Sequence, residues 1–317
     1  MNKPSFSWTI MIFWTLCVIT LGAYTRLSDA GLGCPDWPTC YGQWFLEANA
    51  ASDLSHSDWI KGWIEMIHRY LAGSLGLFVF FITYQAWVRQ EIQFKTVMIF
   101  WGLIIFQALL GMWTVTLKLN PIIVSAHLLG GLLLLIGAVI CNTTPESRTS
   151  AQQKNLILIR WVCVIYTLQI LLGAWVSTNY AGLSCANPWT CQPMHWSGLL
   201  DASKNLFTPD SNPLLIYSTT QKALIQFIHR INAIILGYAL FYTRHCFWKT
   251  NDPLRATLDA ACLLYIVQLM IGILLVALYL PFTIALMHNI FAALLAIPIM
   301  SAIASFYGSS KISIQSK

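Results

Sequence analysis

Charged side chains are scarce in this sequence. Lys, Arg, Asp and Glu make up 9% of the 317 residues, whereas 57% of the residues are hydrophobic. A soluble domain carries about 25% charged residues, so this composition excludes an ordinary soluble globular protein. Together with long apolar runs, it predicts an all-α integral membrane protein.

Two further features are missing. No small-x-small cleavage site follows the first apolar run, which is also longer than the roughly 7–15 residues of a signal-peptide core. We therefore expect a retained helix. The net charge is +6, but no cluster of basic residues is interleaved with aromatics. The positive net charge therefore does not indicate nucleic-acid binding.

The apolar runs predict eight membrane crossings, because a helix needs about 20 apolar residues to span a bilayer. The predicted spans are 7–25, 62–87, 96–116, 122–141, 156–178, 220–243, 256–278 and 282–306.

The distribution of Lys and Arg predicts the orientation of these spans. One set of connecting segments holds eleven of them, and the opposite set holds five, namely Arg26, Lys61, Lys118, Lys204 and Lys222. Basic residues concentrate on the cytoplasmic side of membrane proteins. Both termini should therefore be cytoplasmic, in a plasma (inner) membrane, with the long loops at about 27–61 and 179–219 on the outside.

The chain contains an internal repeat. A shift of 151 (182 − 31) aligns the outer loop from Gly31 with the loop from Gly182, and a shift of 161 (229 − 68) aligns Ile-His-Arg at 67–69 with Ile-His-Arg at 228–230. Because each half has four spans, the halves have the same orientation. The repeat predicts two tandem four-helix bundles, 1–141 and 156–317, joined by a polar cytoplasmic linker at 142–155.

Four histidines lie inside spans. They are His68, His127, His229 and His288, whereas His56 and His195 are predicted in outer loops and His245 at the inner boundary. The intrahelical histidines follow the outer ends of their spans by five to nine residues, a similar depth of roughly 10 Å. Two imidazoles per bundle at equal depth are typical of bis-histidine haem ligation.

Other interpretations of these histidines are weaker. A lone intrahelical histidine usually makes a hydrogen bond within the core, but here two pairs recur with the repeat. Zinc needs further ligands, and no third ligand recurs at this depth in both halves. The pattern therefore favours haem.

The first histidine lies in the sequence Glu65-Met-Ile-His68-Arg69. Ionisable residues inside membrane helices are functional candidates by default. Glu65 shares a helix face with both His68 and Arg69. The second copy has Gln226 in place of the acid and keeps Arg230. Either arginine could bind the carboxylates of a haem edge, or Arg69 could instead pair with Glu65.

The outer loops each contain a Cys-x5-Cys pair, Cys34/Cys40 and Cys185/Cys191. An oxidising compartment permits a disulfide in each loop, which would hold that loop over the outer mouth of its bundle. A pair that exchanges electrons is the alternative. The structural interpretation is favoured for Cys185/Cys191, and both stay open for Cys34/Cys40.

Three spans share Gln-x-x-x-Gly, at Gln107/Gly111, Gln169/Gly173 and Gln268/Gly272. We interpret this motif as helix packing through a small residue, with an amide hydrogen bond between helices, rather than as a ligand site.

Taken together, these features resemble the haem A synthase family over about residues 7–306. The resemblance is carried by the two four-helix halves, Glu-x-x-His-Arg, a histidine in each of spans four, six and eight, and the outer-loop cysteine pairs. It implies a membrane enzyme that oxidises a methyl group of haem O to a formyl group, giving haem A for terminal oxidases.

The resemblance also implies roles for individual residues. His229 and His288 would hold a haem b cofactor in the C-terminal half. His68 and His127 would receive the substrate haem in the N-terminal half, with Glu65 as the catalytic carboxylate. Cys34/Cys40 would contribute to activity. Expected partners are haem O, haem O synthase, an electron acceptor and membrane lipid. A second copy of the chain, in a homo-oligomer, is a further candidate partner.

Three competing functions explain less of the sequence. The first is a bis-haem b-type electron carrier without substrate chemistry. Such a carrier has less need for an acid in one half only, so the difference between Glu65 and Gln226 discriminates against it. A thiol oxidase working through the cysteine pairs leaves the four histidines unexplained. A transporter is suggested only by the repeat and predicts no haem.

Overall fold

The computed structural model describes residues 6–46, 55–144, 149–185, 219–248 and 253–307. Its helices are α1 (Phe6–Leu27), α2 (His56–Val88), α3 (Phe94–Thr116), α4 (Pro121–Asn142), α5 (Ser150–Thr178), α8 (Thr219–Cys246), α9 (Pro253–Ala277) and α10 (Phe282–Ala304). All eight are long and apolar enough to cross a membrane, and no strand occurs within the described ranges. The prediction of an eight-span, all-α membrane protein is confirmed.

Two helices begin six residues before their predicted spans. Helix α2 begins at His56, so this residue lies in a helical turn and not, as predicted, in the outer loop. Helix α5 begins at Ser150, which shortens the predicted linker 142–155 to 143–149. In both cases a hydroxyl residue caps the helix before the apolar run starts: Ser55 Oγ accepts a hydrogen bond from an amide of α2, and Thr149 forms a capping box.

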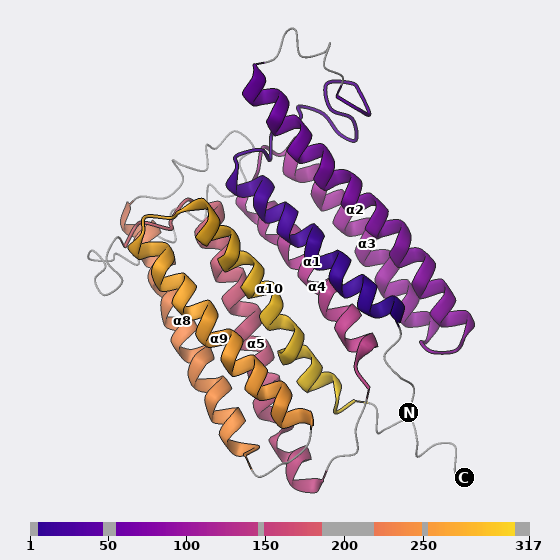
Figure 1. The fold of residues 1–317 in the computed structure, drawn as a ribbon, viewed down its shortest axis with the longest axis vertical. Helices are drawn as coiled ribbons and strands as arrows, with labels where there is room; N and C mark the ends of the chain where they lie inside the picture. The colour runs from indigo at the N-terminus through magenta and orange to yellow at the C-terminus, as the bar shows by residue number, and fades with distance from the viewer. Residues whose placement is uncertain (1–5, 47–54, 145–148, 186–218, 249–252, 308–317) are drawn as a thin grey trace.

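The helices form two rings of four. Helices α1, α2, α3 and α4 each contact the next, and α4 closes back on α1; α5, α8, α9 and α10 do the same. Between the halves, α10 packs against α1 and α4, and α4 also packs against α5. Figure 1 shows the two groups side by side, with α1, α4, α5 and α10 along their boundary.

Apolar side chains fill the end of each ring that lies opposite the Cys34/Cys40 loop, here called the inner end after the predicted topology. In the first ring they come from the start of α1, the end of α2, the start of α3 and the end of α4. In the second they come from the corresponding ends of α5, α8, α9 and α10. A third cluster spans the boundary between the halves. The histidines lie toward the other, outer end, beyond these packed cores.

The repeat extends to the backbone of the outer turns. Asp29 and Tyr180, related by a shift of 151, have φ values of 50° and 51°. Lys118 and Tyr279, related by a shift of 161, have φ values of 47° and 61°. Non-glycine residues seldom adopt this left-handed conformation, and it recurs at both shifts.

Candidate functional site

The first ring brings His68 of α2 and His127 of α4 together. Their ring centroids lie 6.5 Å apart, and the ring planes are inclined by 81°. The Nδ1 atom of each ring is buried and has no hydrogen-bond partner among the described residues. Two imidazoles from different helices therefore lie edge to face, each with an unsatisfied ring nitrogen.

This geometry fits a haem iron between the rings. An imidazole nitrogen lies about 2 Å from a bound metal, so two axial histidines on opposite sides have ring centres about 6 Å apart. A buried polar atom without a partner destabilises the fold by about 1–3 kcal/mol, which a bound group could offset. Within the described ranges, no group of three His, Cys, Asp or Glu residues could hold a metal ion. Paired imidazoles suit haem, which needs two axial ligands, better than zinc, which needs three or four from protein.

Each of the four histidines is packed against a glycine on a neighbouring helix. A Cβ atom at the glycine would lie 3.0–3.3 Å from the imidazole Cε1 in the pairs Gly22/His68, Gly111/His127, Gly173/His229 and Gly272/His288. Such a contact is tighter than side chains normally tolerate, so glycine makes room for the ring. The same arrangement recurs in both halves.

The glutamines of the Gln-x-x-x-Gly motifs lie one turn away from these glycines. The amide nitrogens of Gln169 and Gln268 lie 3.2–3.3 Å from the ring nitrogens of His229 and His288, respectively. Gln107 instead donates to the backbone carbonyl of His127 at 2.7 Å. The predicted hydrogen bonds between helices are therefore confirmed. What sequence reasoning missed is that they reach the candidate ligands.

The polar surroundings of the histidines differ between the halves. In the C-terminal half, Asn232 Nδ2 donates to Gln169 Oε1 at 2.8 Å and to the Ile165 carbonyl at 3.2 Å, which extends the network that reaches His229. The repeat equivalents of Gln169 and Asn232 are Val18 and Leu71. The first ring therefore has apolar side chains at these two positions.

Glu65 is buried at the outer end of α2, where it anchors the outer loop. Its Oε2 accepts a hydrogen bond from the Cys34 amide at 2.9 Å, and its Oε1 pairs with Arg69 at 2.6 Å. In the second half, Gln226 Oε1 accepts from the Cys185 amide at 2.6 Å. This position therefore holds a cysteine backbone in both halves, a role that sequence reasoning missed.

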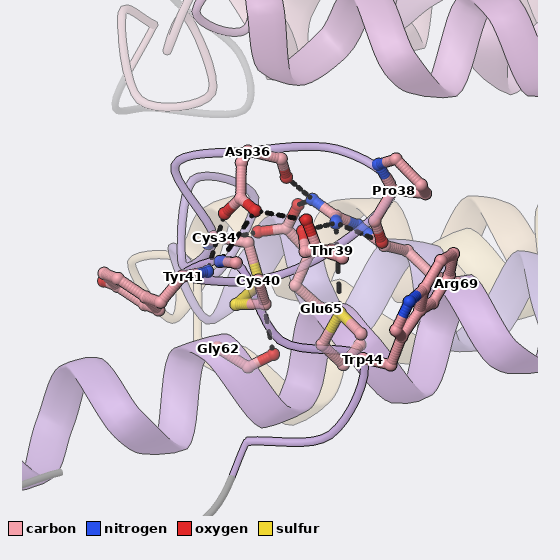
Figure 2. The surroundings of a disulfide bond; sticks show 12 residues. Cys34, Asp36, Pro38, Thr39, Cys40, Tyr41, Trp44, Gly62, Glu65 and Arg69 are labelled. Atoms are coloured by element: carbon pink, nitrogen blue, oxygen red, sulfur yellow. Dashed lines mark hydrogen bonds and ion pairs between the residues drawn. A yellow bond between two sulfur atoms is a disulfide. The ribbon is translucent and has the colours of Figure 1, made fainter. Parts of the chain in front are cut away.

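Arg69 is directed into the same loop. Besides Glu65, its guanidinium donates to the backbone carbonyls of Asp36, Pro38 and Thr39 at 3.0, 3.2 and 2.7 Å (Figure 2). Arg230 likewise donates to the Cys185 carbonyl at 2.8 Å. The geometry is that of the ion-pair alternative for Arg69. A propionate contact for either arginine stays a prediction.

Comparison with known proteins identifies the family of this chain. Residues 6–300 match the COX15-CtaA family, described as cytochrome oxidase assembly protein. Haem A synthase of Shewanella oneidensis is 38% identical, and the match covers 92% of this chain and 93% of the relative. The chain belongs to the haem A synthase family. The haem A synthase of Bartonella quintana is 27% identical and covers 86% of this chain and 84% of its own.

In this member of the haem A synthase family, Cys34 and Cys40 form the predicted disulfide. Both residues are fully buried and pack with Leu46 and Met66 against the outer turns of α2. Thiol exchange requires access to a sulfur, so this burial favours a structural disulfide. The redox interpretation would require the loop to open. Cys191 and His195 lie outside the described residues.

Asp36 is a loop residue that sequence reasoning missed. Its carboxylate accepts hydrogen bonds from the amides of Tyr41 at 2.6 Å and Gly42 at 3.0 Å and from the Thr39 hydroxyl. Tyr41 and Gly42 both have positive φ, so the carboxylate closes a tight turn. Burial acts to raise the pKa of Asp36, but these hydrogen bonds outweigh it and hold the pKa below its usual value. The sequence signal that could have identified this residue is its place between Pro35 and Pro38, which favours a turn.

Proposed function

We propose that this protein oxidises a methyl group of haem O to a formyl group, giving haem A for terminal oxidases. The observation that carries the proposal is the His68/His127 pair, with ring centroids 6.5 Å apart, in a chain 38% identical to a haem A synthase. The conversion removes four electrons and four protons when water supplies the oxygen. It therefore needs a site that holds the substrate haem, a group that accepts protons and an outlet for electrons.

The surroundings of the histidines support different roles for the two halves, one binding a resident haem and the other the substrate haem. His229 and His288 contact glutamine amides, whereas the buried Nδ1 atoms of His68 and His127 have no partner in the described part of the chain. A hydrogen-bonded partner orients a ligating histidine, and its loss typically lowers metal affinity 10–100-fold. The C-terminal pair is therefore suited to a resident haem b, and the N-terminal pair to a substrate that must bind and leave. The resident haem b would supply electron transfer.

Glu65 is the proposed proton acceptor. It lies one helical turn from His68 on the same face of α2, and carboxylates serve as general bases when placed beside the reacting group. Gln226, its equivalent, makes the same bond to a cysteine amide but cannot take up a proton. The two residues therefore hold their loops in the same way and differ in the ability to accept a proton.

We further propose that the protein lies in the inner membrane, with both termini cytoplasmic and the cysteine-bearing loops outside. The support is the excess of Lys and Arg, eleven against five, on the predicted cytoplasmic side. Alkaline phosphatase fused after residue 144 should be inactive, whereas a fusion within the outer loop at residue 50 should be active. The reverse pattern would invert the topology.

The test of function is haem extraction from cells that supply haem O. Wild-type protein should yield haem A on chromatography, and Glu65→Gln should retain haem O with a normal spectrum but form no haem A. Asp58→Asn, which removes an exposed acid from the same helix, is the matched control and should be fully active. Undiminished haem A from Glu65→Gln would remove Glu65 from catalysis. Bound haem without any haem A from the wild type would instead favour the electron carrier.

A further inference from the structure

A cavity of about 160 Å³ lies at the outer end of the boundary between the two rings. The end of α1, the turn between α3 and α4, the first turn of α4 and the end of α5 form its walls. Its lining includes Arg26, Leu32, Lys118, Leu119, Val124 and Tyr180. Two cations therefore face an otherwise largely apolar pocket.

The cavity lies about one helical turn outward from the His68/His127 pair. Arg26 follows Gly22 by four residues on α1, and Gly22 is the glycine packed against the His68 ring. Val124 precedes His127 by three residues on α4. Residues three or four apart share a helix face and are separated by roughly 5 Å along the axis. The cavity is therefore placed above the imidazoles, toward the outside.

Arg26 is only partly neutralised. Its guanidinium lies 4.6 Å from the centre of the Tyr180 ring, and one nitrogen donates to the Ser177 carbonyl at 3.0 Å. The nearest carboxylate, that of the largely exposed Asp29, is 3.8 Å away. A guanidinium has five N–H donors, so several remain for an anion. Lys118 adds a second positive charge to the same cavity.

The two cations are specific to the N-terminal half. Their repeat equivalents are Ser177 (26 + 151) and Tyr279 (118 + 161), both uncharged. The backbone turn at Lys118 is the same as that at Tyr279, so the fold does not require a positive charge there. Both cations also lie on the side where basic residues are scarce. This combination indicates a binding role rather than a structural one.

We propose that Arg26 and Lys118 form a carboxylate-binding site that receives a propionate of the substrate haem. The pocket joins positive charge to the apolar side chains of Leu32, Leu119 and Val124, which suits a carboxylate carried on an apolar ring. The inference rests on the proposed function, because it places the substrate between His68 and His127. The proposal assigns the propionate to Arg26 and Lys118 in place of Arg69, because the Arg69 guanidinium already binds Glu65 and three loop carbonyls.

The test compares haem O with its dimethyl ester, which lacks the propionate charges. Protein in lipid nanodiscs, with haem b bound in the C-terminal half, is titrated with each form and followed by Soret difference spectra. Wild type should prefer the acid. Arg26→Gln and Lys118→Gln should each weaken binding of the acid about tenfold and leave the ester unchanged. The double variant should show no preference.

Arg160→Gln is the matched control. Arg160 also makes one hydrogen bond, to the Tyr307 hydroxyl, and lies near its ring, but at the inner end of α5. It should retain the wild-type preference for the acid. Arg26→Lys should retain part of the preference, and the haem b spectrum of every variant should match that of the wild type, which establishes folding.

Three results would count against the inference in different ways. An unchanged ratio of acid to ester affinity in the double variant overturns it. Loss of co-purified phospholipid phosphorus with that ratio unchanged also overturns it and assigns the cations to lipid phosphate. If His68→Ala and His127→Ala do not alter the haem O titration, the proposed substrate half is wrong, and the failure lies with the proposed function.

Discussion

Glu65 and Gln226 make the same hydrogen bond to a cysteine amide, 2.9 Å in one half and 2.6 Å in the other. Because glutamine serves as the anchor in the second half, anchoring does not require an acid. What Glu65 adds is a negative charge paired with Arg69 and the ability to accept a proton. Structural and chemical roles at this residue can therefore be separated by substitution.

Glu65→Ala should release the loop, whereas Glu65→Gln should not. Loss of a buried hydrogen bond to a charged group lowers local stability by about 2 kcal/mol. Hydrogen exchange at the Cys34 amide should therefore accelerate in Glu65→Ala and stay near wild type in Glu65→Gln. Equal acceleration in both variants would show that charge pairing with Arg69, not the amide bond, holds the loop.

Gln268→Leu should weaken haem b binding in the C-terminal half. The glutamine amide contacts the His288 ring, and removing such a partner typically lowers metal affinity 10–100-fold. The rate of haem transfer to apomyoglobin measures the loss. Gln107→Leu is the matched control, because its amide binds the His127 backbone and not a ring. Equal haem b retention in the two variants would contradict the assignment of Gln268 as a positioning residue.

The outer loop between α1 and α2 is held by contacts of three kinds. The disulfide closes it, Asp36 fixes its turn, and Arg69 binds its carbonyls from the side of α2 (Figure 2). Gly33 lies so close to Lys61 and Gly62 that a Cβ atom there would approach the α2 backbone to 2.5 Å. The part of the loop that the structure describes, up to Leu46, is therefore packed onto α2.

The turn of this loop should loosen in acid. The pKa of Asp36 is depressed in the folded protein, so its contribution to stability is present above the usual carboxyl pKa of about 4. That contribution is lost as the pH falls through the lower, folded-state pKa. Protection factors of the Tyr41 and Gly42 amides should therefore decrease below about pH 4. Asp36→Asn should abolish this pH dependence, and its persistence would implicate another group.

The disulfide should stabilise the loop and resist reduction. A short closed loop is expected to contribute about 2 kcal/mol, so Cys34→Ala/Cys40→Ala should lower the stability of the outer end by about that amount. Because both residues are buried, dithiothreitol should release few thiols until the protein is partly unfolded. Rapid labelling of Cys34 and Cys40 after reduction of the native protein would support the redox interpretation.

The eight helices could be predicted from the length and apolar composition of the runs, because a helix that crosses a membrane must be about 20 residues long and mostly apolar. The helix ends were less predictable, because Ser55 and Thr149 cap α2 and α5 within polar sequence where hydropathy gives no signal. The histidine pairs could be predicted because the repeat sets their depth. The partners of Glu65 and Arg69 could not, since they lie about 30 residues away, in a loop whose path only the folded protein defines.

At the scale of the whole molecule, one apolar cluster joins the two rings. The cluster at their boundary combines residues of α4, such as Leu135 and Val139, with residues of α5, α8, α9 and α10, and side chains of α1 pack against it. Apolar surface of this kind can also face lipid, so association in a membrane depends on close packing rather than on the hydrophobic effect. The small residues Ala293 and Ala296 of α10 lie in this cluster and allow such close packing.

The rings should therefore assemble without the linker. Residues 1–144 and 145–317, co-expressed as separate chains with an affinity tag on the second, should co-purify in detergent and carry haem. Ala296→Phe on α10 should abolish co-purification, because Ala296 is fully buried in the shared cluster and a large side chain cannot be accommodated. Ala126→Phe, at a partly buried position of α4 outside this cluster, is the control for a bulky substitution. Failure of the unmodified halves to co-purify would show that covalent connection, not packing, holds the rings together.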